Sequence, residues 1–223
     1  MYPRCLPCGD RALLVEFGDQ VDLAINRQVN QFATAVRALA LPGVIQVIPT
    51  YCSAMVEYDP ERWPSDSLDQ RLAGLLGVGG AEEDSGRLIE IPTWYAGPDL
   101  QDVAAHTGLP VAEVIGRHSG GLYTVYAVGF SPGFAYMGGL APALATPRIA
   151  TPRIRVPAGS VAIGGQQTGV YPAESPGGWR LLGLTSVKLF DPGRPEPALL
   201  RAGDRVRFVA ISEAEYRRGC EPC

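Results

Sequence analysis

The chain has 223 residues, of which 46% are hydrophobic and 19% are charged, and its formal net charge is −4. This apolar content exceeds that of disordered chains, the charge and the lack of a basic run argue against nucleic-acid binding, and no window reaches the roughly 20 apolar residues of a membrane span. The first residues also lack the apolar core of a secretory signal, so the cytoplasm is the expected location.

Residues 1–80 alternate between strand and helix patterns. After Asp22, apolar residues recur at steps of four and three, which is typical of an amphipathic helix with Asp22 as its N-cap. A second helix is predicted from about Ser65, and the predicted strands are residues 12–17, 44–51 and 53–58. Helices packed on one face of a sheet make an α+β sandwich, so we expect residues 1–80 to form an N-terminal α+β domain.

Residues 77–86 are rich in glycine and charge and have no apolar period, which is typical of a linker, and we expect the domain boundary there. Beyond it the sequence predicts a strand at 88–92 and short helices at 99–106 and 110–118. After His118 the pattern changes to short strands separated by turns, which is typical of a barrel or sandwich. These strands are residues 122–130, 160–164, 169–172, 181–190 and 205–211. We therefore expect a second, β-rich domain over residues 87–215.

The stretch from Tyr123 to Trp179 is the leading candidate for the functional surface. Gly and Pro interrupt its apolar pattern at close intervals, and polar side chains stand between the breaks. Its motifs are Gly-Phe-Ser-Pro-Gly-Phe-Ala-Tyr at 129–136, Thr-Pro-Arg-Ile at 146–149 and again at 151–154, Pro-Ala-Gly-Ser-Val-Ala-Ile-Gly-Gly-Gln at 157–166, and Ser-Pro-Gly-Gly-Trp at 175–179. Loops held by a rigid sheet are common positions for binding and catalytic groups.

Two arginines and one histidine are the charged candidates. The guanidinium groups of Arg148 and Arg153 match phosphate and carboxylate geometry, although arginines in turns are equally well explained as solvated charges. His118 can titrate near neutrality as an acid or a base, or it can simply end a helix favourably. No Walker motif and no metal-catalysis motif is present, so we predict no catalytic metal.

Polar groups in the same loops are candidates for substrate binding. They are Ser131, Tyr136, Gln166 and Ser175, each with the alternative of a local turn hydrogen bond or a core position. Two Cys-x-x-C pairs at the ends of the chain, Cys5 with Cys8 and Cys220 with Cys223, leave open whether the four thiolates bind zinc or are free surface thiols.

The motifs between residues 129 and 179, together with Gly9-Asp10 near the start, resemble the KipI family, which includes PxpB, the B subunit of 5-oxoprolinase, and proteins labelled allophanate hydrolase subunit 1. The resemblance covers nearly the whole chain. It implies an α+β domain followed by a cyclophilin-like β-barrel, in agreement with the patterns above. Likeness to cyclophilin does not imply proline isomerisation, because function depends on the site.

The resemblance also implies a function. It is that of a subunit of a heteromeric, ATP-dependent enzyme that opens 5-oxoproline to glutamate, with a PxpC-like subunit sharing the site and a PxpA-like component also required. ATP, with Mg²⁺ as its counterion, is the expected co-substrate. In such a site Arg148 and Arg153 would bind phosphate oxygens, and His118 would act in catalysis. The alternatives are a KipI-type module that binds and inhibits a histidine kinase, and a component of a urea or allophanate amidolyase.

Overall fold

The computed structural model describes residues 2–64, 67–76 and 86–221. The chain divides into two compact units, residues 1–85 and 86–223, and each is considered by itself. The linker expected at residues 77–86 lies outside the described residues except for Gly86. In the described ranges, no helix is both long and apolar enough to cross a membrane.

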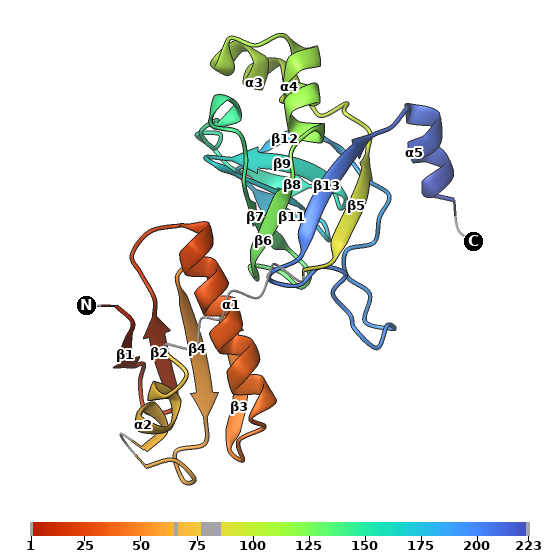
Figure 1. Cartoon of the computed structure of the whole chain (residues 1–223). Coiled ribbons are helices and arrows are strands. Elements are labelled where there is room, and N and C mark those ends of the chain that lie inside the picture. The colour runs from red at the N-terminus through yellow and green to blue at the C-terminus, as the bar shows by residue number, and fades with distance from the viewer. Residues whose placement is uncertain (1, 65–66, 77–85, 222–223) are drawn as a thin grey trace. The chain divides into compact units, whose positions relative to one another are not determined.

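The first unit is one antiparallel sheet with two helices (Figure 1). Its strands are β1 (Arg4–Pro7), β2 (Ala12–Glu16), β3 (Val44–Pro49) and β4 (Ser53–Tyr58), in the order β1-β2-β4-β3, and its helices are α1 (Leu23–Ala38) and α2 (Ser67–Ala73). Strand β1 was not expected from the sequence, because its four residues carry no apolar alternation.

Helix α1 forms where the sequence predicts it. The carboxylate of Asp22 accepts hydrogen bonds from the backbone N–H groups of Ala24 and Ile25 at 2.8 and 3.0 Å, as an N-cap does. The apolar stripe of the helix packs with that of α2 against alternate residues of β2 and β4, which make one core. The expectation of an α+β unit is therefore confirmed.

The second unit contains a seven-stranded sheet in the order β12-β9-β10-β7-β6-β13-β5. The strands are β5 (Leu88–Thr93), β6 (Tyr123–Val128), β7 (Ala135–Gly138), β9 (Ser160–Gly164), β10 (Gln167–Val170), β12 (Arg180–Leu184) and β13 (Arg205–Ala210). The two edge strands meet, because Trp94 just beyond β5 and Leu184 of β12 exchange two backbone hydrogen bonds of 2.8 and 2.9 Å. The sheet is thus a nearly closed barrel, as expected.

Two helices, α3 (Leu100–Thr107) and α4 (Val111–Ser119), lie at one end of the barrel (Figure 1). Their buried residues Leu100, Val103 and Val114 join the barrel's interior core. Two further short elements complete this unit, the 3₁₀ turn η1 (Pro142–Leu144) and the helix α5 (Glu213–Gly219).

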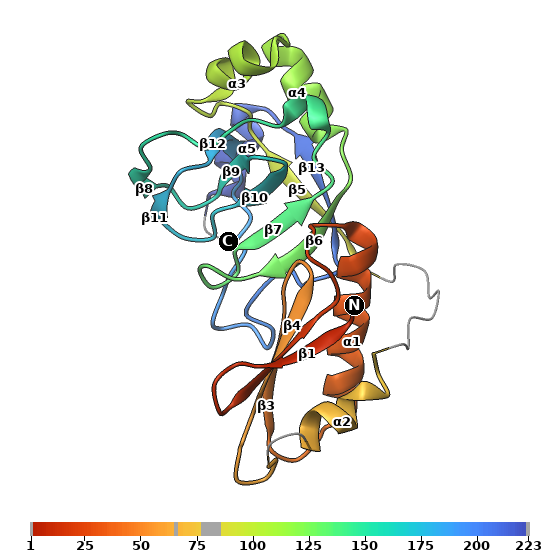
Figure 2. The ribbon, with the colours of Figure 1, turned by 90° about the vertical axis from the view of Figure 1, so that its left-hand side faces the viewer.

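The barrel sheet has a second buried face on its outside. Along β9, Val161 and Ile163 belong to the interior core, whereas Ala162 points to the other side, as strand alternation requires. A separate two-stranded sheet, β8 (Arg153–Val156) with β11 (Ser175–Gly177), lies beside the barrel sheet (Figure 2). Together with these strands, the outward residues form what we call the outer cluster: Phe134, Val156, Ala162, Tyr171, Trp179 and Leu181, with Tyr136 packed against them.

The expectation of one long strand at residues 181–190 is wrong. Strand β12 ends at Leu184, because its neighbour β9 begins opposite at Ser160 and offers no partner beyond that point. The short strands β7, β8 and β11 were not expected either, since three or four residues between Gly and Pro carry too little periodicity.

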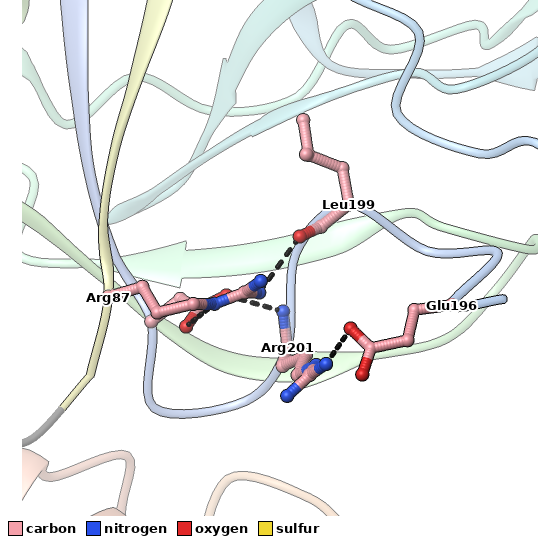
Figure 3. Close-up of polar contacts among 5 residues, drawn as sticks. Arg87, Glu196, Leu199 and Arg201 are labelled. Carbon is pink, nitrogen blue, oxygen red and sulfur yellow. Dashed lines mark hydrogen bonds and ion pairs between the residues drawn. The ribbon is translucent and has the colours of Figure 1, made fainter. Parts of the chain in front are cut away.

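Arg87, at the start of the second unit, is tied to the turn before the last strand by a buried aspartate. Figure 3 labels Arg87 and the residues Leu199, Arg201 and Glu196 near it. Asp204, in the turn before β13, accepts hydrogen bonds from Nε and Nη2 of Arg87 at 3.1 and 2.5 Å and from the backbone N–H of Arg201 at 2.9 Å. Arg87 also donates to the carbonyl of Leu199, and Arg201 pairs with Glu196. Because Asp204 is only 6% exposed, its carboxylate depends on these donors.

We expect Asp204→Asn to lower the free energy of unfolding of the second unit by about 1–3 kcal/mol, because hydrogen bonds to a buried charge are lost. Glu90→Gln is the matched control. Glu90 of β5 and Arg207 of β13 form an ion pair of 3.5 Å, and both side chains are half exposed. That control should change stability by less than about 0.5 kcal/mol. Equal effects in urea denaturation would contradict a special role for Asp204.

Candidate functional site

The first arginine of the candidate site lies in the loop between η1 and β8. The guanidinium carbon of Arg148 is 6.0 Å from the centroid of the Trp179 ring, within the range of a cation–π contact. The neighbouring residue fixes this loop, because the N–H of Ile149 donates to the carbonyl of Gly178 at 2.8 Å. Arg148 is exposed and has no carboxylate partner in the part of the chain that the structure describes, so it is available for an anion.

The second arginine, Arg153, begins β8 and is held by a buried aspartate. Its Nη2 donates to Oδ1 of Asp99 at 2.7 Å, and Oδ2 of Asp99 accepts from the backbone N–H of Leu181 at 2.6 Å. The other terminal nitrogen of Arg153, Nη1, is buried and has no hydrogen-bond partner among the described residues. Buried polar atoms are normally paired, so this nitrogen marks a place where a ligand acceptor fits.

Aromatic rings line the same region. Tyr136 lies 4.8 Å from Phe134 and 6.0 Å from Trp179 between ring centroids, and Phe134 lies 5.3 Å from Tyr171. All these pairs are edge-on, the geometry that aromatic quadrupoles favour. The rings form a rigid apolar wall beside the two arginines.

The two arginines lie close enough to Tyr171 and Tyr136 to influence the pKa values of these phenols. Burial raises the pKa of Tyr171, opposed by a hydrogen bond with the backbone of Trp179 and by the charges of Arg148 and Arg153. Burial likewise raises the pKa of Tyr136, opposed by the charge of Arg148. Both phenols are therefore protonated at neutral pH, and both arginines act on the same aromatic wall.

A glycine lets β11 approach this wall. Gly177 pairs with Arg153 across the β8–β11 sheet, and a Cβ at this position would lie 2.3 Å from the hydroxyl of Tyr171. A side chain there would clash with the ring of Tyr171, so the first glycine of the Ser-Pro-Gly-Gly-Trp motif has a steric reason.

The two candidate serines lie at the edges of the outer cluster. In the loop after β6, the backbone carbonyl of Ser131 accepts a hydrogen bond of 3.0 Å from the N–H of Phe134. Ser175 begins β11 and lies opposite Val156 of β8. Both hydroxyls are buried without a hydrogen-bond partner in the described ranges. Gln166 differs from them, because it is exposed in the two-residue turn between β9 and β10.

His118 lies on the other side of the barrel sheet, in the interior core. It is fully buried, with its ring centroid 4.6 Å from that of Phe208 and 5.3 Å from that of Tyr123. Burial lowers the pKa of His118 from its ordinary value of 6.5 to about 3. The expectation that this histidine titrates near neutrality is therefore wrong, because a helix-end position alone does not reveal burial in a barrel.

The hydrogen bonds of His118 define its tautomer. The hydroxyl of Thr168 donates to the carbonyl of Ala162 at 2.9 Å, so its oxygen can only accept from Nε2 of His118, 2.8 Å away. Nδ1 is then the acceptor for the hydroxyl of Tyr95 at 2.7 Å. Both nitrogens of a neutral ring are satisfied, which fits the lowered pKa.

The structure thus brings Arg148, Arg153 and Tyr136 to the outer cluster, with Ser131 and Ser175 at its edges. His118 lies apart from them. Asp99 and Tyr171 are the residues of this site that the sequence patterns did not indicate. Asp99 stands before α3, in the position of an ordinary N-cap, yet it makes no cap hydrogen bond and instead binds Arg153, 54 positions away.

The cysteines give no metal site among the residues that are described. Cys8 and Cys220 are exposed, Cys5 is half-buried, and no group of three or more potential ligands gathers there. Cys223 lies outside the described residues, so the four-cysteine zinc site stays a hypothesis.

Comparison with known proteins places the chain in a family. The family described as "Carboxyltransferase domain, subdomain C and D" matches residues 3–200. The chain is 51% identical over 213 residues to the B subunit of 5-oxoprolinase from Haemophilus influenzae, covering 92% of this chain and 96% of that protein. It is 40% identical over 227 residues to the B subunit of 5-oxoprolinase from Bacillus subtilis, covering 93% and 92%.

Solved structures agree on the fold. The crystal structure of TTHA0988 superposes with a TM-score of 0.83 at 43% identity over 91% of this chain, which spans 40% of the length of that chain. The urea amidolyase of K. lactis superposes with a TM-score of 0.76 at 21% identity over 96% of this chain and 15% of its own, a likeness of fold alone. From its matched length and its identity to these relatives, the chain belongs to the carboxyltransferase subdomain C and D family and, within it, to the B subunits of 5-oxoprolinase.

Proposed function

We propose that this chain is the B subunit of an ATP-dependent 5-oxoprolinase and that the outer cluster with Arg148 and Arg153 is its part of the reaction site. The observation that carries the proposal is the guanidinium of Arg153, whose Nη2 is held by Asp99 and whose Nη1 is buried without a hydrogen-bond partner among the described residues. Arg148, at the same aromatic wall, has no carboxylate partner among them. Relatives with 40% and 51% identity are B subunits of 5-oxoprolinase, which supports this choice of reaction.

The chemistry of lactam opening needs such a site. The lactam oxygen takes the γ-phosphoryl group of ATP, and ADP leaves. One water then adds to the activated carbon and the C–N bond breaks, with a proton going to nitrogen, to give an acyl phosphate. A second water releases glutamate and phosphate. Guanidinium groups stabilise the charge on the phosphoryl oxygens, and phenol or serine hydroxyls donate to the developing oxyanion.

The proposed enzyme is heteromeric. A PxpC-like subunit would complete the site, and a PxpA-like component would also be required, in the cytoplasm where ATP is available. ATP would enter with Mg²⁺ as its counterion. This chain's contribution is to bind and orient oxyanions, with Ser131 and Ser175 as neutral donors; Tyr136 would be part of the wall, and Gln166 a contact at its rim. We propose that His118 holds the barrel's interior rather than contacting substrate, because both of its nitrogens are occupied there.

A substrate panel tests the proposal. The chain, purified with its PxpA-like and PxpC-like partners, is given ATP with 5-oxoproline, urea or allophanate, and the release of ADP and amide-derived product is measured. We expect turnover of 5-oxoproline, with one ADP for each glutamate formed. Turnover of urea or allophanate alone would instead favour an amidolyase component.

A binding module is the second candidate, and exposed apolar side chains favour it. Phe130 is 66% exposed, in a left-handed backbone conformation of φ 70°, and Ile154 of β8 is 85% exposed. Such residues fit an interface with another protein. If the chain alone inhibits the autophosphorylation of a histidine kinase and its complex shows no lactam opening, the kinase-binding function replaces the enzymatic one.

A further inference from the structure

We propose that Asp99 is a positioning residue, which holds Arg153 so that its Nη1 binds an oxyanion of the ligand, either a carboxylate or a phosphate group. This inference rests on the proposed function for the place of the reaction, and it adds the ligand chemistry and the residue that organises it.

Asp99 is built to hold one orientation of the guanidinium group. Its side chain is 4% exposed, so its carboxylate takes its hydrogen bonds from the protein. One oxygen accepts from Leu181 of the barrel strand β12 at 2.6 Å, and the other accepts from Nη2 of Arg153 at 2.7 Å. The aspartate therefore links a rigid barrel strand to the arginine at the start of β8, and Arg153 cannot rotate freely.

The remaining donor is the feature that needs a ligand. A guanidinium group carries N–H donors on Nε and on both terminal nitrogens. Asp99 occupies Nη2, whereas Nη1 is buried and unpartnered in the part of the chain that is described. The hydroxyl of Ser175, on the strand paired with β8, is also buried and unpartnered there. In the register of this sheet Ser175 is opposite Val156 and Gly177 is opposite Arg153. The unpartnered Nη1 itself fits an oxyanion, because charge-assisted hydrogen bonds are the strong ones.

The charge of the surroundings favours an anion. Arg155 and Arg180 form ion pairs with the exposed carboxylates of Glu174 and Asp102. Arg153 is balanced by Asp99, so Arg148 is left, over the described ranges, as the uncompensated positive charge among these arginines. We infer a division of roles in which Arg153 is the fixed donor and the exposed Arg148 moves to bind the same anion.

Carboxylate and phosphate share this chemistry and come from different sources, the carboxylate from 5-oxoproline and the phosphate from ATP. Guanidinium nitrogen NMR of the isolated full-length chain distinguishes them. The probes are inorganic phosphate, 5-oxoproline and 2-pyrrolidinone, which is the same lactam ring without a carboxylate. The Arg153 signals are assigned by their loss in Arg153→Lys.

We expect phosphate, 5-oxoproline or both to shift the Arg153 signals, and 2-pyrrolidinone to leave them unchanged. Asp99→Asn should weaken this binding at least ten-fold and broaden the Arg153 signals, since the guanidinium loses its anchor. Asp102→Asn is the matched control, because Asp102 lies three residues further along, in the first turn of α3, and its exposed carboxylate pairs with Arg180. It should bind anions as the unmodified chain does.

The inference is overturned if the folded chain shows no shift of Arg153 with either anion, or if Asp99→Asn and Asp102→Asn bind alike. A loss of binding that comes from unfolding is separated by the melting temperature, and Asp99→Glu, which keeps the charge, should restore part of the binding. Anion binding in a complex that does not open 5-oxoproline would refute the proposed function and leave this inference intact. Turnover of 5-oxoproline without any shift of the Arg153 signals would refute this inference and leave the proposed function intact.

Discussion

Arg153→Ala is expected to lower the turnover of 5-oxoproline by the assembled complex at least about 100-fold, the scale on which single donors to a developing charge act. The reason is that Nη1 of Arg153 is a fixed, desolvated donor, and alanine removes it together with the positive charge. Turnover is measured as glutamate release at saturating ATP, with assembly followed by size-exclusion chromatography.

Two further variants make this result interpretable. Arg155 is on the same strand, two residues after Arg153, and its side chain is 76% exposed and paired with Glu174 at the surface. Turnover of the Arg155→Ala variant should therefore stay within about two-fold of that of the unmodified chain. Arg148→Ala should lower turnover about ten-fold or more without changing the melting temperature, because Arg148 is exposed and its contact with Trp179 is a cation–π contact at the surface. If the Arg148→Ala and Arg153→Ala variants each assemble and each keep unchanged turnover, neither arginine takes part in the reaction.

Acidification is expected to destabilise the second unit through His118. Its pKa is about 3 in the folded chain and near 6.5 when the chain is unfolded. Below pH 6.5 the unfolded chain therefore binds a proton that the folded chain does not. The contribution of the neutral His118 to the free energy of unfolding is therefore fully present above pH 6.5, and it falls as the pH drops toward 3. The slope approaches about 1.4 kcal/mol for each pH unit in that window.

The comparison of two variants isolates this effect. The chain has two histidines, and His106 is exposed at the end of α3. Urea unfolding at pH 7, 5.5 and 4.5 should show the same pH slope for His106→Gln as for the unmodified chain. His118→Gln should be less stable at pH 7 by about 2–4 kcal/mol, since its packing with Phe208 and its bonds to Tyr95 and Thr168 are disturbed. It should also lose most of the slope, and an unchanged slope would refute the buried, neutral histidine.

Local sequence patterns predict those parts of the fold that depend on neighbouring residues. The stripe after Asp22 predicts α1 because a helix buries every third or fourth residue, and the short strands after His118 predict a barrel or a sandwich. The capping box at Ser212 and Glu215 was present in the sequence and would have indicated α5. The β8–β11 sheet was not predictable in this way, because each strand is too short to show a period.

The site was predictable only in part, for the same reason. The doubled Pro-Arg motif indicated Arg148 and Arg153, which the structure brings to one aromatic wall. The partner of Arg153 lies 54 residues earlier, before a helix, so no local pattern reveals it. His118 was misjudged in its titration because its burial depends on Tyr95, Thr168 and Phe208, which come from distant elements.

The most direct test is glutamate release from 5-oxoproline and ATP by the reconstituted enzyme, with each component left out in turn. The account predicts full activity with this chain and both partners present, and no activity above background when this chain is omitted. Activity that does not depend on this chain, or an assembled complex that releases no glutamate, would contradict it.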